Sequence, residues 1–551
     1  MDRRTFLARG AAVLGGAAVS GGAAYGAWIG THSSAGPGSA KSGRPGKRPT
    51  TGGRRSGAGK KFAPVENTTL PSGVTVPTAR WVVEENALPG TTAWIVTGPQ
   101  APGAIEGFAD SVSAQAGETV SLFVNTTATT FHVEAYRMGY YQGLGARLVW
   151  TSPELTGRSQ APPQFTPGIN MIECHWDQSV ALELTDAWTP GCYLLKLVGS
   201  GGEQQYVPLT VRDDASRAAY VIQNSVTTWE AYNLWGGYSL YLGATPGGGQ
   251  TFANRSRTVS FDRPYAQDIS QGSSDFLGNE YPLISWAEEL GLDVTYWTDV
   301  DLHARPQLLT NHRCLFSMGH DEYWSMQMRN AALAALPAGV NLAFLGANAC
   351  YRQIRLDSSP LGPNRHEICY KDAAEDPLDG VDDALVTAPS WDSPPTSWPE
   401  SILIGSMYQS IGANAPLAVA DTSSWLMEGT GLINGITLPH VVQGEYDRFD
   451  LALAGPRNVE IVAHSPVVKN GTTNYSDVTY YTVTNAGGVF ATGTAAWVFK
   501  LADFSPVIPV HTAVPGVTAP LRRIMENVFG VFGAGPAGMS HPSQENWQQF
   551  Y

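Results

Sequence analysis

This chain of 551 residues lacks several features that mark common protein classes. Charged residues make up only 15%, and the five cysteines form neither a CxxC pair nor a cysteine–histidine spacing typical of zinc modules. No G-x-S-x-G or G-x-C-x-G elbow occurs, which argues against a serine or cysteine nucleophile. Beyond the first 30 residues no apolar run reaches 18 residues, so we expect no membrane span in the mature body.

Basic residues are also scarce after the N-terminal segment. Residues 1–61 hold eleven Lys and Arg against one acid, Asp2. Subtracting these from totals of 34 and 48 leaves 23 basic and 47 acidic residues, a net charge of −24. Nucleic-acid binding needs a basic face, so we expect no nucleic-acid partner.

The N-terminus is a basic head followed by a weakly apolar stretch. Arg3-Arg4, one further residue and Phe6-Leu7 precede a Gly/Ala-rich run over 10–29. This pattern resembles a twin-arginine export signal, which we assign to residues 1–32, and it predicts a secreted, extracytoplasmic protein. A membrane anchor is the alternative, since the run is about 20 residues long. The Gly-, Ser- and Lys-rich segment that follows predicts a disordered linker over 33–84.

Hydrophobic residues amount to 43%, with 16 Trp, 22 Tyr, 60 Gly and 37 Pro, which predicts a β-rich, multi-domain protein. Residues 85–214 alternate apolar and polar in short runs between turn residues, which favours an immunoglobulin-like antiparallel β-sandwich. Cys174 and Cys192 fall on neighbouring predicted strands, so a disulfide between them is expected at an oxidising location.

Residues 215–535 show a different pattern, and 536–551 form a predicted C-terminal tail. Strands at 221–222, 293–297, 314–319 and 340–345 alternate with helices near 275–290 and 324–336. Such alternation predicts an α/β domain with a mainly parallel sheet, whose ligands bind at the carboxyl ends of the strands.

Three segments at those strand ends carry candidate functional residues. His320 and Glu322 follow one strand and share a face in an extended chain. A loop rich in tyrosine, from Tyr232 to Tyr241, follows another, and phenolate oxygens suit a hard trivalent cation. Asn348, after a third strand, could orient a substrate carbonyl. The alternatives are an ordinary capped strand end and an aromatic loop that only packs.

The segments Trp229–Asn233 with Ser239–Tyr241, Gly319–Trp324 and Leu345–Asn348 resemble, in order and approximate spacing, the catalytic domain of the N,N-dimethylformamidase large (beta) subunit family. The resemblance covers roughly residues 218–535. It implies a glutamine-amidotransferase-like fold and one iron held by two tyrosines and a glutamate. Carried over, the metal ligands are Tyr232, Tyr241 and Glu322, with Tyr238 as an alternative to Tyr232.

The expected function is hydrolysis of a small-molecule amide at its C–N bond by mononuclear Fe(III). The metal would polarise the carbonyl, His320 would act as base or second-shell donor, and Asn348 would bind substrate. Two alternatives stay open: a non-catalytic cell-surface or carbohydrate-binding protein, and a zinc or calcium hydrolase built from His320, Asp321 and Glu322. The sequence also leaves a homo-oligomer open.

Overall fold

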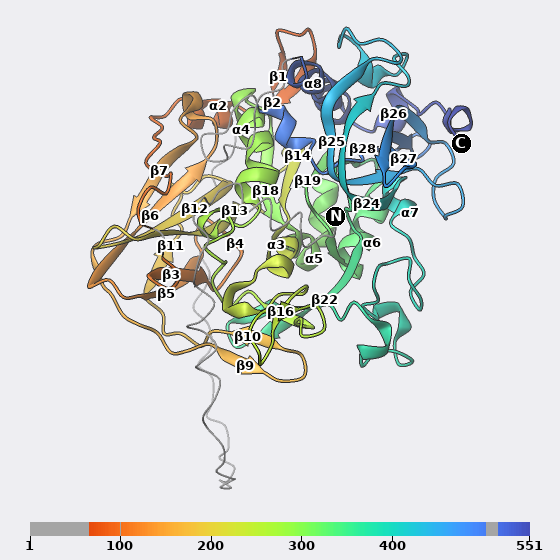
Figure 1. Cartoon of the computed structure of the whole chain (residues 1–551). Coiled ribbons are helices and arrows are strands. Elements are labelled where there is room, and N and C mark those ends of the chain that lie inside the picture. Colours follow the sequence, from red (N-terminus) through yellow and green to blue (C-terminus); the bar gives the residue numbers. More distant parts are fainter. Residues whose placement is uncertain (1–65, 100, 503–515) are drawn as a thin grey trace, which may run out of the picture.

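The computed structural model describes residues 66–99, 101–502 and 516–551 (Figure 1). The first elements are strands β1 (Glu66–Thr69) and β2 (Thr75–Thr78), which form an antiparallel hairpin, and helix α2 (Arg80–Asn86). Val76 and Val82 are fully buried in the main core. Residues 66–84, which were predicted to belong to the linker, form ordered elements instead, because these apolar side chains pack in the core. The predicted export signal lies outside the described residues.

Two sheets that share one core follow. Strands β3, β5 and β11 form the smaller sheet, and β4, β6, β7, β8, β12 and β13 form the larger one. Their core includes Val124 and Leu182 from one sheet and Leu195 and Val207 from the other. The predicted antiparallel strands are thus present, and their immunoglobulin-like character stays a prediction. The bounds are β3 (Ile105–Ala109), β4 (Ser113–Gln115), β5 (Thr119–Thr126), β6 (Thr130–Met138), β7 (Ala146–Thr151), β8 (Leu155–Thr156), β11 (Val180–Glu183), β12 (Gly191–Gly199) and β13 (Gln204–Arg212).

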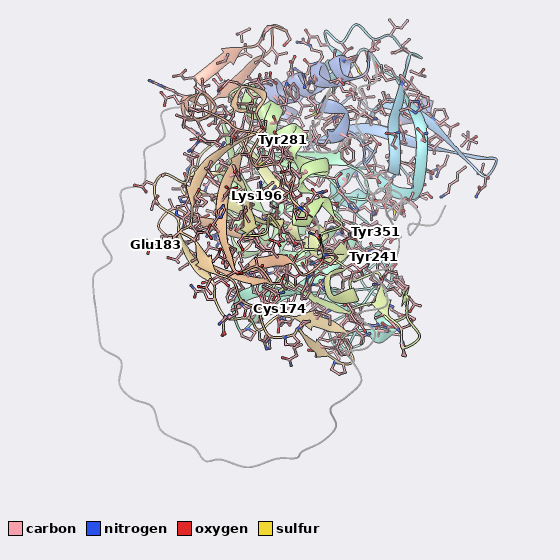
Figure 2. All side chains as sticks on the ribbon, turned by 60° about the vertical axis from the view of Figure 1, so that its left-hand side comes forward. Cys174, Glu183, Lys196, Tyr241, Tyr281 and Tyr351 are labelled. Carbon is pink, nitrogen blue, oxygen red and sulfur yellow. The ribbon has the colours of Figure 1, made fainter. Side chains whose placement is uncertain are left out.

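A short hairpin leaves this pair of sheets between β8 and β11. It consists of β9 (Gln164–Thr166) and β10 (Met171–Glu173), which pair only with each other. Cys174 directly follows β10, whereas Cys192 lies in β12. The predicted disulfide is wrong: both cysteines are free and buried in different clusters, since β10 pairs with β9 and not with β12 (Cys174 is labelled in Figure 2).

The centre of the molecule is a seven-stranded sheet in the order β18-β14-β19-β21-β28-β27-β26, of which the first five strands are parallel. The strands predicted at 293–297, 314–319 and 340–345 are confirmed to within one residue, because each observed strand is buried along its whole length. The amidotransferase-like topology stays a prediction. The strands are β14 (Tyr220–Asn224), β18 (Val294–Thr298), β19 (Cys314–Gly319), β21 (Asn341–Gly346), β26 (Glu460–Lys469), β27 (Thr472–Thr482) and β28 (Gly488–Ala491).

Helices and smaller sheets surround this central sheet (Figure 1). A four-stranded sheet has the order β17-β23-β22-β20, and β24 and β25 form a long hairpin. Strand β20 begins directly after Glu322. The bounds are α3 (Val226–Tyr232), α4 (Tyr281–Glu289), α5 (Asp299–Ala304), α6 (Met326–Ala335), α7 (Ser401–Ile404), α8 (Thr518–Ala534), α9 (Ala537–Ser540), β15 (Gly243–Ala244), β16 (Gln250–Thr251), β17 (Thr258–Ser260), β20 (Tyr323–Ser325), β22 (Arg352–Ser359), β23 (Gly362–Ile368), β24 (Met407–Ala418) and β25 (Thr437–Arg448).

The C-terminal residues are packed onto the body and are not a free tail. The Tyr551 hydroxyl donates to Asp477 Oδ2 at 2.6 Å, and the Asn546 side chain donates to the Ile461 carbonyl at 3.1 Å. The predicted tail over 536–551 is therefore part of the fold, because its aromatic side chains complete a hydrophobic cluster beside β26 and β27.

Candidate metal centre

Two neighbouring parallel strands deliver the candidate ligands. Strand β14 leads into α3, which ends at Tyr232, and β19 ends at Gly319, three residues before Glu322. Because β14 and β19 pair in parallel, their carboxyl ends meet at one edge of the sheet. Gly319 makes the sharp exit possible: its φ is +54°, and a Cβ there would lie 2.5 Å from the Asn279 carbonyl oxygen.

Backbone contacts hold the two segments together. The Thr228 hydroxyl on α3 accepts hydrogen bonds from the amides of Glu322, at 2.9 Å, and Tyr323, at 3.3 Å. The Leu240 amide donates to the Ala231 carbonyl at 3.0 Å, which folds the tyrosine loop back onto α3. Helix α3 therefore positions both the carboxylate and the second tyrosine.

The three predicted ligands converge. Tyr232 Oη lies 2.6 Å from Glu322 Oε2 and 2.9 Å from Tyr241 Oη. Tyr241 Oη lies 2.9 and 3.0 Å from the two Glu322 oxygens. The phenol rings stack with centroids 4.5 Å apart and pack on a small apolar cluster, while Glu322 is fully buried. The structure thus brings together the whole set that the resemblance implied.

The donor set fits a single hard cation. Two oxygens bonded to one ion at about 2 Å on perpendicular axes lie about 2.8 Å apart, close to the spacings found here. Two phenolates and a carboxylate supply three negative charges, which match a trivalent ion. The buried His320 Nε2 and Asn348 Oδ1 beside them have no hydrogen-bond partner among the described residues, which is typical of a site shaped for a further group.

The alternatives considered from sequence are not supported by this geometry. Tyr238 turns away from the cluster and packs its ring against Phe165, with centroids 5.3 Å apart. Asp321 points into the interior, where its carboxylate accepts from Gln223, Ser317 and Trp324. Among the described residues, no three His, Cys, Asp or Glu side chains form a metal-binding group, which argues against the zinc or calcium site.

His320 lies among three carboxylates. Its Nε2 is 3.5 Å from Glu322 Oε2 and from Glu445 Oε2, and its Nδ1 is 3.5 Å from Asp275 Oδ2. These distances exceed good hydrogen bonds, so the contacts are mainly electrostatic. Burial alone would lower the pKa of His320, but the three carboxylates outweigh it and raise the pKa to about 10. This arrangement favours the protonated imidazole, which is a donor, one of the two roles expected for His320.

Two carboxylates hold Asn348, whose role in binding substrate stays a prediction. Its φ is +60°, its amide donates to Asp447 Oδ1 at 2.9 Å, and its Nδ2 donates to Glu445 Oε2 at 3.1 Å. The bond to Glu445 uses one of the two hydrogens on the side-chain nitrogen, and the other can donate to a substrate carbonyl. The Oδ1 can accept from a substrate N–H or a water.

Sequence reasoning missed Glu445 and Asp447 on β25. Both are buried, and both face Asn348 from a strand about 100 residues further along the chain. A signal existed in the sequence: the two acids stand two residues apart in one strand, so they share one face. Their partners could not be read from sequence, because the pairing is long-range.

Two basic side chains also border the cluster. Arg352 Nε lies 3.2 Å from Glu322 Oε1, and Lys371 Nζ lies 3.1 Å from the centroid of the Tyr241 ring. The amide of the preceding Tyr351 donates to the Glu322 carbonyl at 2.9 Å, and Figure 2 shows Tyr351 and Tyr241 in the same part of the molecule. Positive charge on both sides stabilises ionised oxygens in the trio.

Comparisons with known proteins identify relatives of this chain. The N,N-dimethylformamidase beta subunit of Paracoccus aminophilus is 22% identical over 413 residues, or 60% of this chain and 52% of that protein. The corresponding subunit of an Alcaligenes species is 24% identical over 315 residues, or 48% of this chain and 39% of that protein. The chain thus spans about half the length of the curated relatives it matches, or less.

A solved glucanotransferase structure from a Paenibacillus species aligns with 23% of this chain and 17% of its own, at 13% identity and a TM-score of 0.13, and carries no argument. The family model for the N,N-dimethylformamidase beta subunit-like C-terminal region matches residues 132–511. The match begins inside the β-sandwich, well before residue 218, so the likeness is wider than expected. By this match over more than half of its length, the chain belongs to the N,N-dimethylformamidase beta subunit-like family.

Proposed function

We propose that this chain is a metal-dependent hydrolase of the C–N bond of a small, non-peptide amide. The observation that carries the proposal is the convergence of Tyr232, Tyr241 and Glu322, whose oxygens lie 2.6–3.0 Å apart at the carboxyl edge of a parallel sheet. Membership of a family whose named relatives are N,N-dimethylformamidase subunits supports an amide as the substrate class.

The proposed cofactor is one Fe(III) held by the two phenolates and the carboxylate. When bound, it would act as a Lewis acid toward the amide carbonyl. Arg352, at 3.2 Å from Glu322 Oε1, fixes the orientation of the carboxylate and favours its ionised form. Lys371 over the Tyr241 ring favours ionised oxygen in the same way.

We assign proton transfer to the pair His320 and Glu445, whose Nε2 and Oε2 lie 3.5 Å apart. Asn348 Nδ2 holds the Glu445 carboxylate in place at 3.1 Å. In hydrolysis a water oxygen bonds to the carbonyl carbon, its proton passes to this pair, and the pair returns a proton to the nitrogen as the C–N bond breaks. The products are a carboxylic acid and an amine.

Export by the twin-arginine route and an extracytoplasmic location remain part of the proposal, supported by Arg3, Arg4 and the Gly/Ala-rich run. In the described part of the chain no helix is long and apolar enough to cross a membrane. Whether the chain forms a homo-oligomer stays open.

The test is metal analysis of the purified full chain together with an amine-release assay on N,N-dimethylformamide and small homologues. We expect about one iron per chain, a visible phenolate-to-iron absorption band, and activity that a chelator removes and ferric ion restores. A colourless protein with no bound transition metal that still hydrolyses the amide would refute the metal-dependent mechanism. If the protein releases no amine from any small amide, the proposal that it is an amide hydrolase is refuted.

A further inference from the structure

The loop between the two tyrosine ligands is held by the β-sandwich. Its 3₁₀ turn η2 (Trp235–Gly237) begins at Trp235, whose indole Nε1 donates to Glu106 Oε2 on β3 at 2.8 Å. The same indole meets Trp176 edge-on, with ring centroids 6.1 Å apart. Both contacts come from residues far earlier in the chain, so they join the sandwich to the loop.

The hairpin β9–β10 supplies two more contacts to the same loop. Gly236 has φ +73°, and a Cβ there would lie 2.8 Å from Ile172 Cγ2, so glycine allows both the turn and the close approach of β10. The Phe165 ring of β9 packs on Tyr238. Figure 1 shows β9 and β10 near β16, and Asn170 Nδ2, in the turn between β9 and β10, donates to the carbonyls of Asn254 and Arg255 shortly after β16.

Glu106 is an unusual residue to find at this contact. It is 7% exposed, and in the described part of the chain it forms no ion pair. Burial raises its pKa, while hydrogen bonds from Trp235 and from Asn125 Nδ2, at 3.1 Å, lower it. Burying a carboxylate costs free energy unless hydrogen bonds compensate, and one of its two side-chain donors is the indole of the ligand loop.

Hydrogen bonds to and within the loop connect Trp235 to the nearby tyrosine ligand Tyr241. Arg263 donates to the carbonyls of Trp235 and Tyr238, and the Ser239 hydroxyl accepts from the Tyr241 amide at 3.1 Å. The spacing of Tyr232 and Tyr241 therefore depends on where Trp235 is held.

We propose that Trp235 is a positioning residue, through which the β-sandwich holds Tyr232 and Tyr241 at the spacing needed to share one cation. This assigns the sandwich a role in the metal centre. The part of the proposal that concerns the cation rests on the proposed function; the part that concerns the loop does not.

The experiment compares Trp235→Phe with Trp188→Phe in the full chain without added metal. Trp188 is a buried tryptophan of the same sandwich, 3% exposed, whose ring packs on Tyr193 in the sandwich core. The first change removes the hydrogen bond to Glu106 and keeps an aromatic ring. Hydrogen–deuterium exchange should become about tenfold faster at the amides of residues 237–241 in Trp235→Phe only, since a hydrogen bond to a charged group is lost there.

A second measurement follows iron. Each protein is titrated with ferric ion supplied as its citrate chelate while the visible band is recorded. We expect Trp235→Phe to bind about 10–100-fold more weakly than the wild type, as changes next to a ligand do, and Trp188→Phe to bind as the wild type does.

The outcomes separate the two proposals. Unchanged exchange in Trp235→Phe, or an equal rise in both variants, would overturn the positioning role whatever the metal does. Equal iron affinity in the wild type and Trp235→Phe would overturn its link to the metal centre. A wild type that binds no iron would instead count against the proposed function and the cation part, with exchange still deciding whether the sandwich holds the loop.

Discussion

Replacing Tyr241 with Phe removes a single oxygen from the proposed metal centre. That atom lies 2.9 and 3.0 Å from the Glu322 oxygens and 2.9 Å from Tyr232 Oη. The ring stays, so its stacking on Tyr232 and its contact with Lys371 stay as well. The substitution therefore separates ligand chemistry from packing.

We expect the substitution to lower the free energy of unfolding only slightly and the affinity for iron strongly. In the metal-free protein Glu322 keeps Tyr232 and Arg352 as partners, so the free energy of unfolding should fall by only about 1.5 kcal/mol, the lower range for a hydrogen bond to a charged group. For a bound ion, changes in outer-shell partners alone cost about 10–100-fold in affinity. Loss of a direct donor should cost more than about 100-fold, or more than about 2.7 kcal/mol.

The assay measures iron per chain, the visible band and chelator-free thermal unfolding on the same samples. Tyr238→Phe is the matched control, because it makes the same change in the same loop, outside the trio. We expect the Tyr241 variant to be pale and iron-poor but folded, and the control to be unchanged. If the Tyr241 variant keeps full iron and colour, or both variants lose them equally, the ligand assignment is refuted.

Four further predictions are independent of that result. Changing Arg3 and Arg4 together to Lys should retain the protein inside the cell, and unchanged secretion would refute the twin-arginine assignment. Glu288→Gln leaves the fully buried Arg137 without its carboxylate partner at 2.5 Å and should lower the free energy of unfolding in urea by about 3–5 kcal/mol; a change below about 1 kcal/mol would contradict this. Although burial acts in the opposite direction, hydrogen bonds from two histidines and a serine lower the pKa of Glu173 from 4.5 to about 2. Its contribution to stability is therefore complete above pH 4.5 and is lost as the pH falls toward 2, so unfolding curves of Glu173→Gln should lack this acid-side loss. Thiol titration of the denatured, unreduced protein should find all five cysteines, and a count of three would restore the disulfide.

Much of the central fold could be predicted because parallel strands leave a strong local pattern. The strands at 314–319 and 340–345 are buried on both faces, so each is rich in apolar residues, and helix α6 lies between them. The short strands of the sandwich were recognised as a class. The pairing of these strands was not predicted. Cys174 and Cys192 are separated because β10 pairs with β9, whereas β12 pairs with β13.

The ends of the chain were predicted less well for a related reason. The segment from Glu66 to residue 84 was included in the predicted linker, yet Val76 and Val82 are buried, since α8 near the other end of the chain covers the β1–β2 hairpin. The sequence of the hairpin alone does not indicate that it packs against a helix near the other end of the chain. The same holds for the residues after 536, whose aromatic side chains pack beside β26 and β27.

For the site, sequence alone determined which residue types stand at the ends of neighbouring parallel strands, and the resemblance identified Tyr232, Tyr241 and Glu322 among them. Only the tertiary structure decided between Tyr232 and Tyr238, turned Asp321 inward, and brought Glu445 from β25 to His320 and Asn348. Strand and helix periodicity is a local property, set by the backbone and by burial of one face. The direction of a loop side chain and the partner of a distant strand depend on contacts made only when the whole chain has packed.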